Sequence, residues 1–267
     1  MKEIMDMSFQ RDKWREYQNQ LVQHFRRTNI EFGPAWTTPF VPWCGDQYWH
    51  SSPKILFVGK SVGARSEKPD HYWRMRLADW QSRTDLDPAK ETADYVHDQL
   101  YSQSPASHAF WTIPMLIAGA LLPPSAECDH LIDLIAWSNL YKVNTVVKRS
   151  VNGRVTEQYE IPKSAPCAGS NSECDCMKCN SLRWLGREVD ILQPDVIVFG
   201  IGPEWARLRG HWDAHCPERL TGKVRDLLRS HHEPASAWLT YHFSAWAMEI
   251  RHGGVILDIR KDLTWLR

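Results

Sequence analysis

The stretch KILFVGKSVG, residues 54–63, decides the fold class of this chain. Its apolar beginning has the length and residue types of a buried β-strand, here 54–59, and the two glycines are typical of a tight turn into a helix. Further apolar runs at 134–143, 195–200 and 237–242 are separated by helical patterns. Strands that alternate with helices predict an α/β fold, a three-layer α/β/α sandwich with a four-stranded parallel core sheet.

The remaining segments fit one domain spanning residues 1–267, because no linker divides the chain. Residues 30–53, rich in Pro, Trp and Gly, predict an irregular lead-in. Residues 144–149 and 154–161 predict a β-hairpin, since the Asn-Gly pair between them is a strong turn signal. Apolar residues recur at helical spacing in six segments: 8–28, 73–82, 88–101, 106–121, 180–192 and 218–230.

The composition narrows the classes of partner. Lys+Arg and Asp+Glu both number 32, so a nucleic-acid partner would have to bind a local basic stripe rather than a globally basic surface. Of the 14 tryptophans, Trp73, Trp80, Trp212 and Trp246 lie in polar stretches, where flat rings suit stacking on bases. The chain has no 18-residue apolar run and no signal-peptide pattern, which predicts a cytoplasmic protein without membrane contact. Nothing indicates an obligate protein partner.

Three strand ends carry residues suited to handling a nucleobase. The turn Gly59–Gly63 follows the first strand, Asn139 ends an apolar run, and His242 ends the last strand. Ligands of open α/β sheets bind at the carboxyl ends of the strands, so these residues are predicted to line one pocket. Taken singly, each also fits a structural role, as a tight turn, a turn asparagine and a satisfied core histidine.

The same turn fits the nucleophile-elbow pattern G-x-S-x-G, with Ser61 as nucleophile and His242 as base of a serine hydrolase. Two features count against it. The elbow normally follows several strands, whereas only a helix and the lead-in precede residue 54, and an oxyanion segment of the His-Gly-Gly type is missing from the sequence. The hydrolase is therefore the alternative interpretation.

In series, the motifs resemble those of the uracil-DNA glycosylase superfamily. The family's first motif is matched by Gly59-Lys60-Ser61-Val62-Gly63, its pyrimidine-reading strand by Ile135–Asn139, and its His-Pro-Ser motif by His242-Phe243-Ser244. Phe110-Trp111 resembles a helix start of the mismatch-specific branch, and Cys179–Gly200 resembles a helix-to-strand segment of the iron–sulfur branches. The resemblance implies a DNA glycosylase that acts on an extruded nucleotide.

Roles follow from the resemblance. Asn139 would read the pyrimidine edge, and His242 would donate a hydrogen bond to the departing base. Tyr72 or Trp73 would stack on the base, and the turn glycines Gly59 and Gly63 would also belong to the base-binding site. Trp246 would be the wedge that fills the gap. Ser61, or one of Glu67, Asp70 and His71, would position water.

The sequence also departs from the family pattern. Ser61 replaces the water-activating Asp or Asn, Val62 replaces a proline of the first motif, and Phe243 replaces the proline of the last. These changes favour a modified pyrimidine over plain uracil. A hypermodified cytosine of phage DNA fits, with a role in antiviral defence or base-excision repair.

A cysteine-rich loop at 166–179 is the second strong signal. Cys167, Cys174, Cys176 and Cys179 have the spacing C-x6-C-x-C-x2-C, which brings four thiolates within reach of one ion. A four-cysteine set favours a structural zinc, while the resemblance and Cys44 leave a [4Fe–4S] cluster as the alternative. A third interpretation of the whole chain is thus a metal-stapled nucleic-acid-binding module without catalysis.

We expect the purified chain to carry one zinc ion, because four cysteines so close in a polar loop form a closed tetrahedral site. Elemental analysis checks this, and Cys174→Ser should lose the metal whereas Cys128→Ser, at an ordinary thiol, should keep it. A brown protein with visible absorption bands would indicate the cluster instead. A metal-free folded protein with all four thiols titratable would contradict both.

Overall fold

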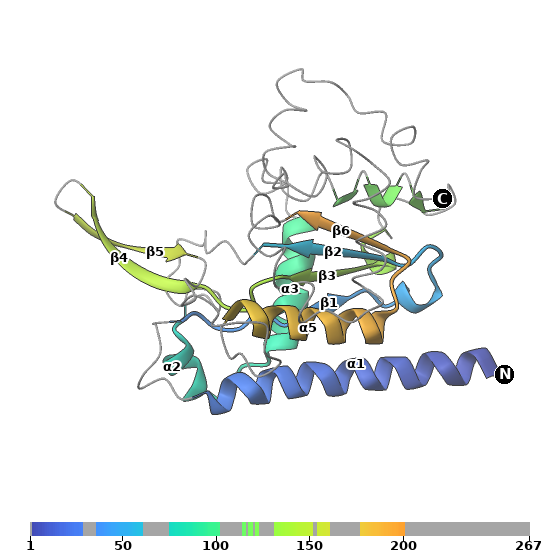
Figure 1. Ribbon diagram of the computed structural model, residues 1–267, viewed down its shortest axis with the longest axis horizontal. Coiled ribbons are helices and arrows are strands. Elements are labelled where there is room, and N and C mark those ends of the chain that lie inside the picture. Colours follow the sequence, from blue (N-terminus) through green and yellow to red (C-terminus); the bar gives the residue numbers. More distant parts are fainter. Residues whose placement is uncertain are drawn as a thin grey trace, which may run out of the picture.

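The computed structural model describes residues 2–28, 36–60, 75–101, 114–115, 117–119, 121–122, 131–151, 154–160 and 177–200. Within them the chain has an α/β architecture, with a central sheet, helices packed beside it and a hairpin that projects from one end (Figure 1). The expected helix at 218–230 and strand at 237–242 lie outside the described residues.

The central sheet has the order β1-β3-β2-β6. Three of the four predicted core strands are present and pair in parallel: β2 (Ile55–Gly59), β3 (Ile135–Asn139) and β6 (Val196–Gly200). Every residue of β2 and β3 is buried. Strands covered on both faces consist of continuous apolar runs rather than alternating patterns, which explains why the sequence signal was clear.

The fourth described strand is antiparallel and lies in the segment expected to be irregular. This strand, β1 (Trp43–Cys44), pairs with β3 through Trp43↔Trp137 and Cys44↔Ala136. The pairing continues beyond it, as the Phe40 N–H donates to the Lys142 carbonyl at 2.6 Å. The prediction of an irregular lead-in at 30–53 was therefore wrong for this part, because a two-residue strand has no periodicity to detect.

The helices begin and end at local signals in the sequence. Helix α3 (Pro88–Tyr101) has the predicted bounds, and the Asp87 carboxylate accepts hydrogen bonds from the backbone N–H groups of Ala89 and Lys90 at 3.0 and 3.4 Å. This is an N-cap followed by proline at the first helical position. Helix α5 (Met177–Leu192) is followed by Gln193, whose φ of 49° is the left-handed conformation common just after a helix, and then by a proline.

The amphipathic N-terminal helix is confirmed and is longer than predicted. Helix α1 (Lys2–Arg27) buries the expected stripe, with Trp14, Tyr17, Leu21 and Phe25 each 5 % exposed or less. Helix α2 (Leu77–Gln81) is shorter than the predicted 73–82. Within it Trp80 is fully buried, so this ring belongs to the core and is not available for stacking on bases.

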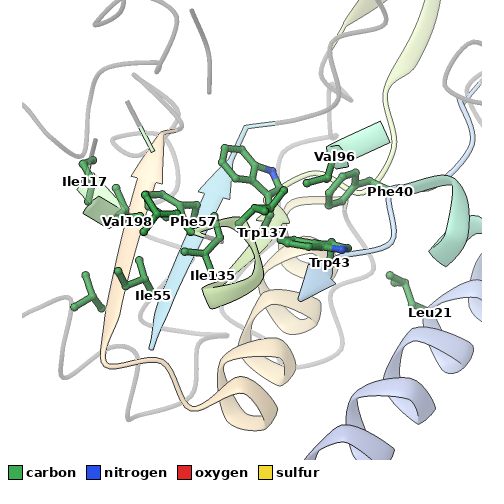
Figure 2. Close-up of a cluster of buried hydrophobic side chains, with 14 of the residues drawn as sticks. Leu21, Phe40, Trp43, Ile55, Phe57, Val96, Ile117, Ile135, Trp137 and Val198 are labelled. Carbon is green, nitrogen blue, oxygen red and sulfur yellow. The ribbon is translucent and has the colours of Figure 1, made fainter. Parts of the chain in front are cut away.

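Alternate residues of the strands enter two hydrophobic clusters, and burial of each large apolar side chain contributes roughly 1.5–3 kcal/mol. The first cluster includes Phe57 and Trp137, whose rings stack at 5.9 Å, and Val96 of α3 (Figure 2). The second takes the other side of the strands and residues from α1 and α5, namely Trp14, Tyr17, Leu56, Val58, Ala136, Leu182, Leu185 and Val189.

The predicted hairpin is confirmed. Strands β4 (Thr145–Val151) and β5 (Arg154–Glu160) form a separate two-stranded antiparallel sheet, with Val151 opposite Arg154. That register leaves Asn152-Gly153 as a two-residue connection, the shortest loop that joins antiparallel strands. None of the helices in the described ranges is long and apolar enough to cross a membrane.

Candidate functional site

The carboxyl ends of the three parallel strands place a glycine, an asparagine and a second glycine side by side. Gly59, the last residue of β2, pairs with Asn139 of β3 on one side and with Gly200 of β6 on the other. Two of the three strand ends predicted to line one pocket are therefore neighbours, while His242, the third, lies outside the described residues. Because ligands of parallel sheets bind at this edge, the row is the candidate site.

The Asn139 side chain lies directly against Gly59. A Cβ atom added at Gly59 would be 2.4 Å from Asn139 Oδ1 and 3.3 Å from a ring carbon of Trp137. Atoms at 2.4 Å clash, so only glycine at position 59 leaves room for the amide. A glycine at position 59 is therefore explained by the close approach of the Asn139 side chain and not by turn geometry alone.

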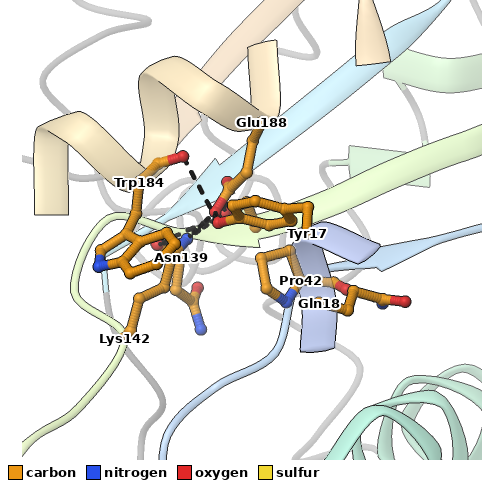
Figure 3. A network of polar contacts seen from close by, with 8 residues as sticks. Tyr17, Gln18, Pro42, Asn139, Lys142, Trp184 and Glu188 are labelled. Atoms are coloured by element: carbon orange, nitrogen blue, oxygen red, sulfur yellow. Dashed lines mark hydrogen bonds and ion pairs between the residues drawn. The ribbon is translucent and has the colours of Figure 1, made fainter. Parts of the chain in front are cut away.

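The Asn139 side chain is buried, and the residue is 4 % exposed. Its backbone carbonyl accepts hydrogen bonds from Ser138 Oγ and from Lys142 Nζ (Figure 3). An asparagine amide carries two donors and an acceptor, so it can bind a ligand that presents the complementary groups.

A buried ion pair fixes the backbone of Asn139. Lys142 Nζ lies 2.7 Å from Glu188 Oε1, with the two side chains 1 % and 0 % exposed. The same ammonium donates to Ser138 Oγ and to the Asn139 carbonyl, both at 2.7 Å (Figure 3). Its three donors thus have three acceptors, which is the condition for burying a charge without a large penalty.

Glu188 connects this cluster to two helices. It lies on α5 and accepts hydrogen bonds from Ser138 Oγ at 2.5 Å and from the Tyr17 hydroxyl of α1. The Tyr17 hydroxyl also lies 3.4 Å from the Trp184 carbonyl. One carboxylate therefore ties β3, α1 and α5 together at the level of the site.

Burial changes the titration of these groups. Desolvation lowers the pKa of Lys142, and the neighbouring Glu188 carboxylate opposes this shift. Desolvation, followed by the charge and hydrogen bond of Glu188, raises the pKa of Tyr17 well above its ordinary value. Tyr17 therefore stays protonated at neutral pH and acts as a donor.

The sequence-based prediction did not include Lys142 and Glu188, although each is a charged residue at an otherwise apolar position. Lys142 is a charge within the apolar run 140–143, and Glu188 falls on the apolar face of α5, between Leu185 and Leu192. Opposite charges at apolar positions of two elements indicate a buried pair. Their spacing along the chain does not reveal that they meet.

The hydrogen bonds after β3 extend the parallel pairing into the turn. The N–H groups of Leu140 and Tyr141 donate to the carbonyls of Gly59 and Lys60 at 2.8 and 3.0 Å. The backbone is thus held up to the residue before Ser61. The other predicted site residues lie outside the described ranges: Ser61, Gly63, Tyr72, Trp73, His242, Trp246, Cys167, Cys174 and Cys176.

The described cysteines bear on the metal prediction. Cys179 lies in the first turn of α5. Cys44 pairs with Ala136, three residues before the carboxyl end of β3, and its thiol donates to the Gly45 carbonyl at 3.6 Å. Burial raises the pKa of the Cys44 thiol well above its ordinary value, which disfavours the thiolate that a metal requires. Among the described residues, no three His, Cys, Asp or Glu side chains gather to hold a metal.

Comparison with known proteins finds no matching family model, curated protein or solved structure. The site itself therefore carries the functional argument.

Gly59→Ala should displace the Asn139 amide and destabilise the fold by about 1–3 kcal/mol, the usual range for overpacking a core. In the Asn139→Ala background the same substitution should cost much less, because the atom it strikes is gone. Urea unfolding of the two single variants and the double variant measures this. If the losses of unfolding free energy in the two single variants add up to the loss in the double variant, the two side chains do not contact each other.

Lys142→Met should destabilise the protein by about 3–5 kcal/mol, because it leaves the Glu188 carboxylate buried without its counter-ion. Lys142→Met with Glu188→Gln should be more stable than Lys142→Met alone, since the neutral amide keeps partners for Ser138 and Tyr17. Free energies of unfolding in urea provide the measurement. If the loss of unfolding free energy in the double variant equals the sum of the losses in Lys142→Met and in Glu188→Gln, the ion pair is contradicted.

Proposed function

We propose that this protein is a DNA glycosylase that hydrolyses the N-glycosidic bond of an extruded pyrimidine-derived nucleotide. The observation that carries the proposal is the buried Asn139 side chain, whose amide oxygen lies against Gly59 at the carboxyl edge of the parallel strands. Its order in the chain, after a glycine turn and before a strand-end histidine, is that of the uracil-DNA glycosylase motifs.

An asparagine amide suits a pyrimidine edge. It offers two donors and one acceptor in a plane, so it can bind neighbouring donor and acceptor atoms of a base together. Lys142 and the paired strands hold the backbone of Asn139, and the amide is therefore oriented before the base arrives. A base bound by a rigid group loses less entropy, which favours recognition of the flipped nucleotide.

The chemistry of the proposal is displacement at the sugar C1′ atom. Water adds its oxygen to C1′, the glycosidic bond breaks, and the base leaves with the electron pair. The proton that the water loses passes through solvent to the departing base. His242 would donate a hydrogen bond to the charge that develops on the base, and Ser61 would orient the water. Tyr72 or Trp73 would stack on the base, and Trp246 would occupy the gap in the duplex.

This mechanism requires a further parallel strand at 237–242, which would bring His242 to the edge where Asn139 lies and would complete a three-layer sandwich. Ser61, one residue past the described end of the turn, is a weaker water-binding group than a carboxylate. We therefore propose a modified pyrimidine, such as a hypermodified cytosine of phage DNA, as the substrate. The role would be defence or base-excision repair.

A zinc ion bound by Cys167, Cys174, Cys176 and Cys179 would be structural. It would fix the loop that precedes α5 to the first turn of that helix, where Cys179 lies. Because Glu188 is on the same helix, the metal would also stabilise the placement of the ion pair beneath the site.

His242→Ala should lower the single-turnover rate of base excision about 10²–10³-fold and leave DNA affinity nearly unchanged, since the hydrogen bond strengthens only in the transition state. The measurement uses duplexes that contain uracil, thymine mismatches or glycosylated hydroxymethylcytosine. Asn139→Ala is the matched variant, and it should weaken base binding as well as rate.

The competing functions give different results. Loss of activity in Ser61→Ala but not in His242→Ala, with covalent labelling of Ser61 by a fluorophosphonate, would replace the glycosylase with a serine hydrolase. Binding of DNA without release of any base from the substrate set would leave the non-catalytic module.

A further inference from the structure

The peptide group between Asn139 and Leu140 is held at both of its polar atoms. Its carbonyl oxygen accepts a hydrogen bond from Lys142 Nζ at 2.7 Å, and its N–H donates to the Gly59 carbonyl at 2.8 Å. Because a peptide group is planar, fixing both atoms restrains the backbone of Asn139, and with it the direction of the Asn139 side chain. Whatever holds the Lys142 ammonium in place therefore also affects the amide that lies against Gly59.

The two hydrogen bonds of this peptide strengthen each other. A donor at the carbonyl polarises the peptide and makes its N–H a better donor, here to the last residue of β2. The next peptide continues the contact, since the Tyr141 N–H donates to the Lys60 carbonyl at 3.0 Å. A displaced ammonium would thus loosen both the backbone of Asn139 and its contact with the start of the glycine turn.

The place of the ammonium depends on the Glu188 carboxylate. Lysine carries its charge on a flexible stem, so the position of Lys142 Nζ follows that of its partners, Glu188 Oε1 and Ser138 Oγ, each at 2.7 Å. Ser138 in turn donates to Glu188 Oε2 at 2.5 Å. Neighbouring residues of a strand face opposite sides, so the carboxylate lies across the sheet from the Asn139 side chain.

Tyr17 of α1 restrains this carboxylate. Its hydroxyl donates to Glu188 Oε1, the oxygen that also pairs with Lys142 (Figure 3). The ring is fixed by other contacts, because it stacks on Trp14 with 5.4 Å between ring centroids and meets the Trp184 ring edge-on at 5.7 Å. A hydroxyl on a ring held in this way limits where the carboxylate, and hence the ammonium, can lie.

A second buried tyrosine offers a comparison. Tyr48 belongs to the same hydrophobic cluster as Tyr17, and both are buried, at 0 % and 1 % exposed. The Tyr48 hydroxyl also donates to α5, but to the Leu192 carbonyl at 3.3 Å. Among the described contacts, the Tyr17 hydroxyl reaches the charge pair beneath Asn139 and the Tyr48 hydroxyl does not. The two residues differ in what the hydroxyl contacts and not in burial.

We propose that Tyr17 is a positioning residue for base recognition. Through Glu188 and Lys142, its hydroxyl sets the orientation of the Asn139–Leu140 peptide and of the Asn139 amide. Helix α1 is thereby part of the recognition apparatus, although it packs on the other face of the sheet. The inference rests on the proposed function for the identity of the ligand, a pyrimidine-derived base, and adds the residue that orients the group reading it.

The experiment compares Tyr17→Phe with Tyr48→Phe, each of which keeps the ring and removes only the hydroxyl. Both variants should lower the melting temperature by a few degrees, because each loses one buried hydrogen bond. NMR spectra of the nitrogen-labelled protein give the first readout. The backbone N–H signal of Leu140 and the side-chain amide signals of Asn139, assigned from their absence in Asn139→Ala, should shift in Tyr17→Phe and stay in place in Tyr48→Phe.

Single-turnover excision gives the second readout. Tyr17→Phe should lower the rate by up to about 100-fold, the effect of a small misplacement of a positioned group, whereas Tyr48→Phe should retain the wild-type rate. Tyr17→Phe should also weaken binding of a duplex that carries the base. Its affinity for the same duplex with an abasic-site analogue should be unchanged, because that probe has no base for Asn139 to read. A general loss of folding would weaken binding of both duplexes.

Unchanged Asn139 and Leu140 signals in Tyr17→Phe would overturn the inference, as would equal losses of excision in the two tyrosine variants. If Tyr17→Phe does not fold, Glu188→Gln replaces it, with the same shifts expected and the same result counting against the proposal. Excision that is active in the wild type and unaltered in a variant with shifted signals rejects the positioning role and leaves the glycosylase. If the wild type releases no base, the glycosylase is rejected and the NMR shifts alone decide the link from Tyr17 to Asn139.

Discussion

The buried contact between Lys142 and Glu188 is the constraint on which the site depends. The two charges come from the segment after β3 and from α5, and both are removed from water. Such a pair is tolerated only when every donor and acceptor is matched, which requires Ser138, the Asn139 carbonyl and Tyr17 to be in place together. The requirement selects one packing of the helices on the strands, because a purely apolar interface tolerates small shifts and a charge network does not.

The network contacts the backbone of Asn139 and not its side-chain amide. Lys142 donates a hydrogen bond to the backbone carbonyl, while the side-chain amide lies against Gly59. The first strand of the hairpin begins six residues later, at the same end of the sheet (Figure 1).

The sequence by itself determined the elements whose signals are local. The apolar runs of β2, β3 and β6 appear because strands buried on both faces need continuous apolar residues. The bounds of α3 follow from the Asp87-Pro88 start, and the hairpin follows from Asn152-Gly153 between two strand patterns. The adjacency of Gly59 and Asn139 was also predictable, since parallel strands end at a common edge.

Only the tertiary structure decided the contacts between distant segments. The strand β1 gains its conformation from pairing with β3, and two residues are too few for a pattern. The partners Lys142 and Glu188 stand 46 positions apart, and each alone looks like a misplaced charge on an apolar face. The clash that a side chain at Gly59 would make is equally invisible in the sequence, where a turn explains the glycine. Local signals depend on a residue and its neighbours in the sequence. Burial of charge and close packing depend on how the whole chain folds.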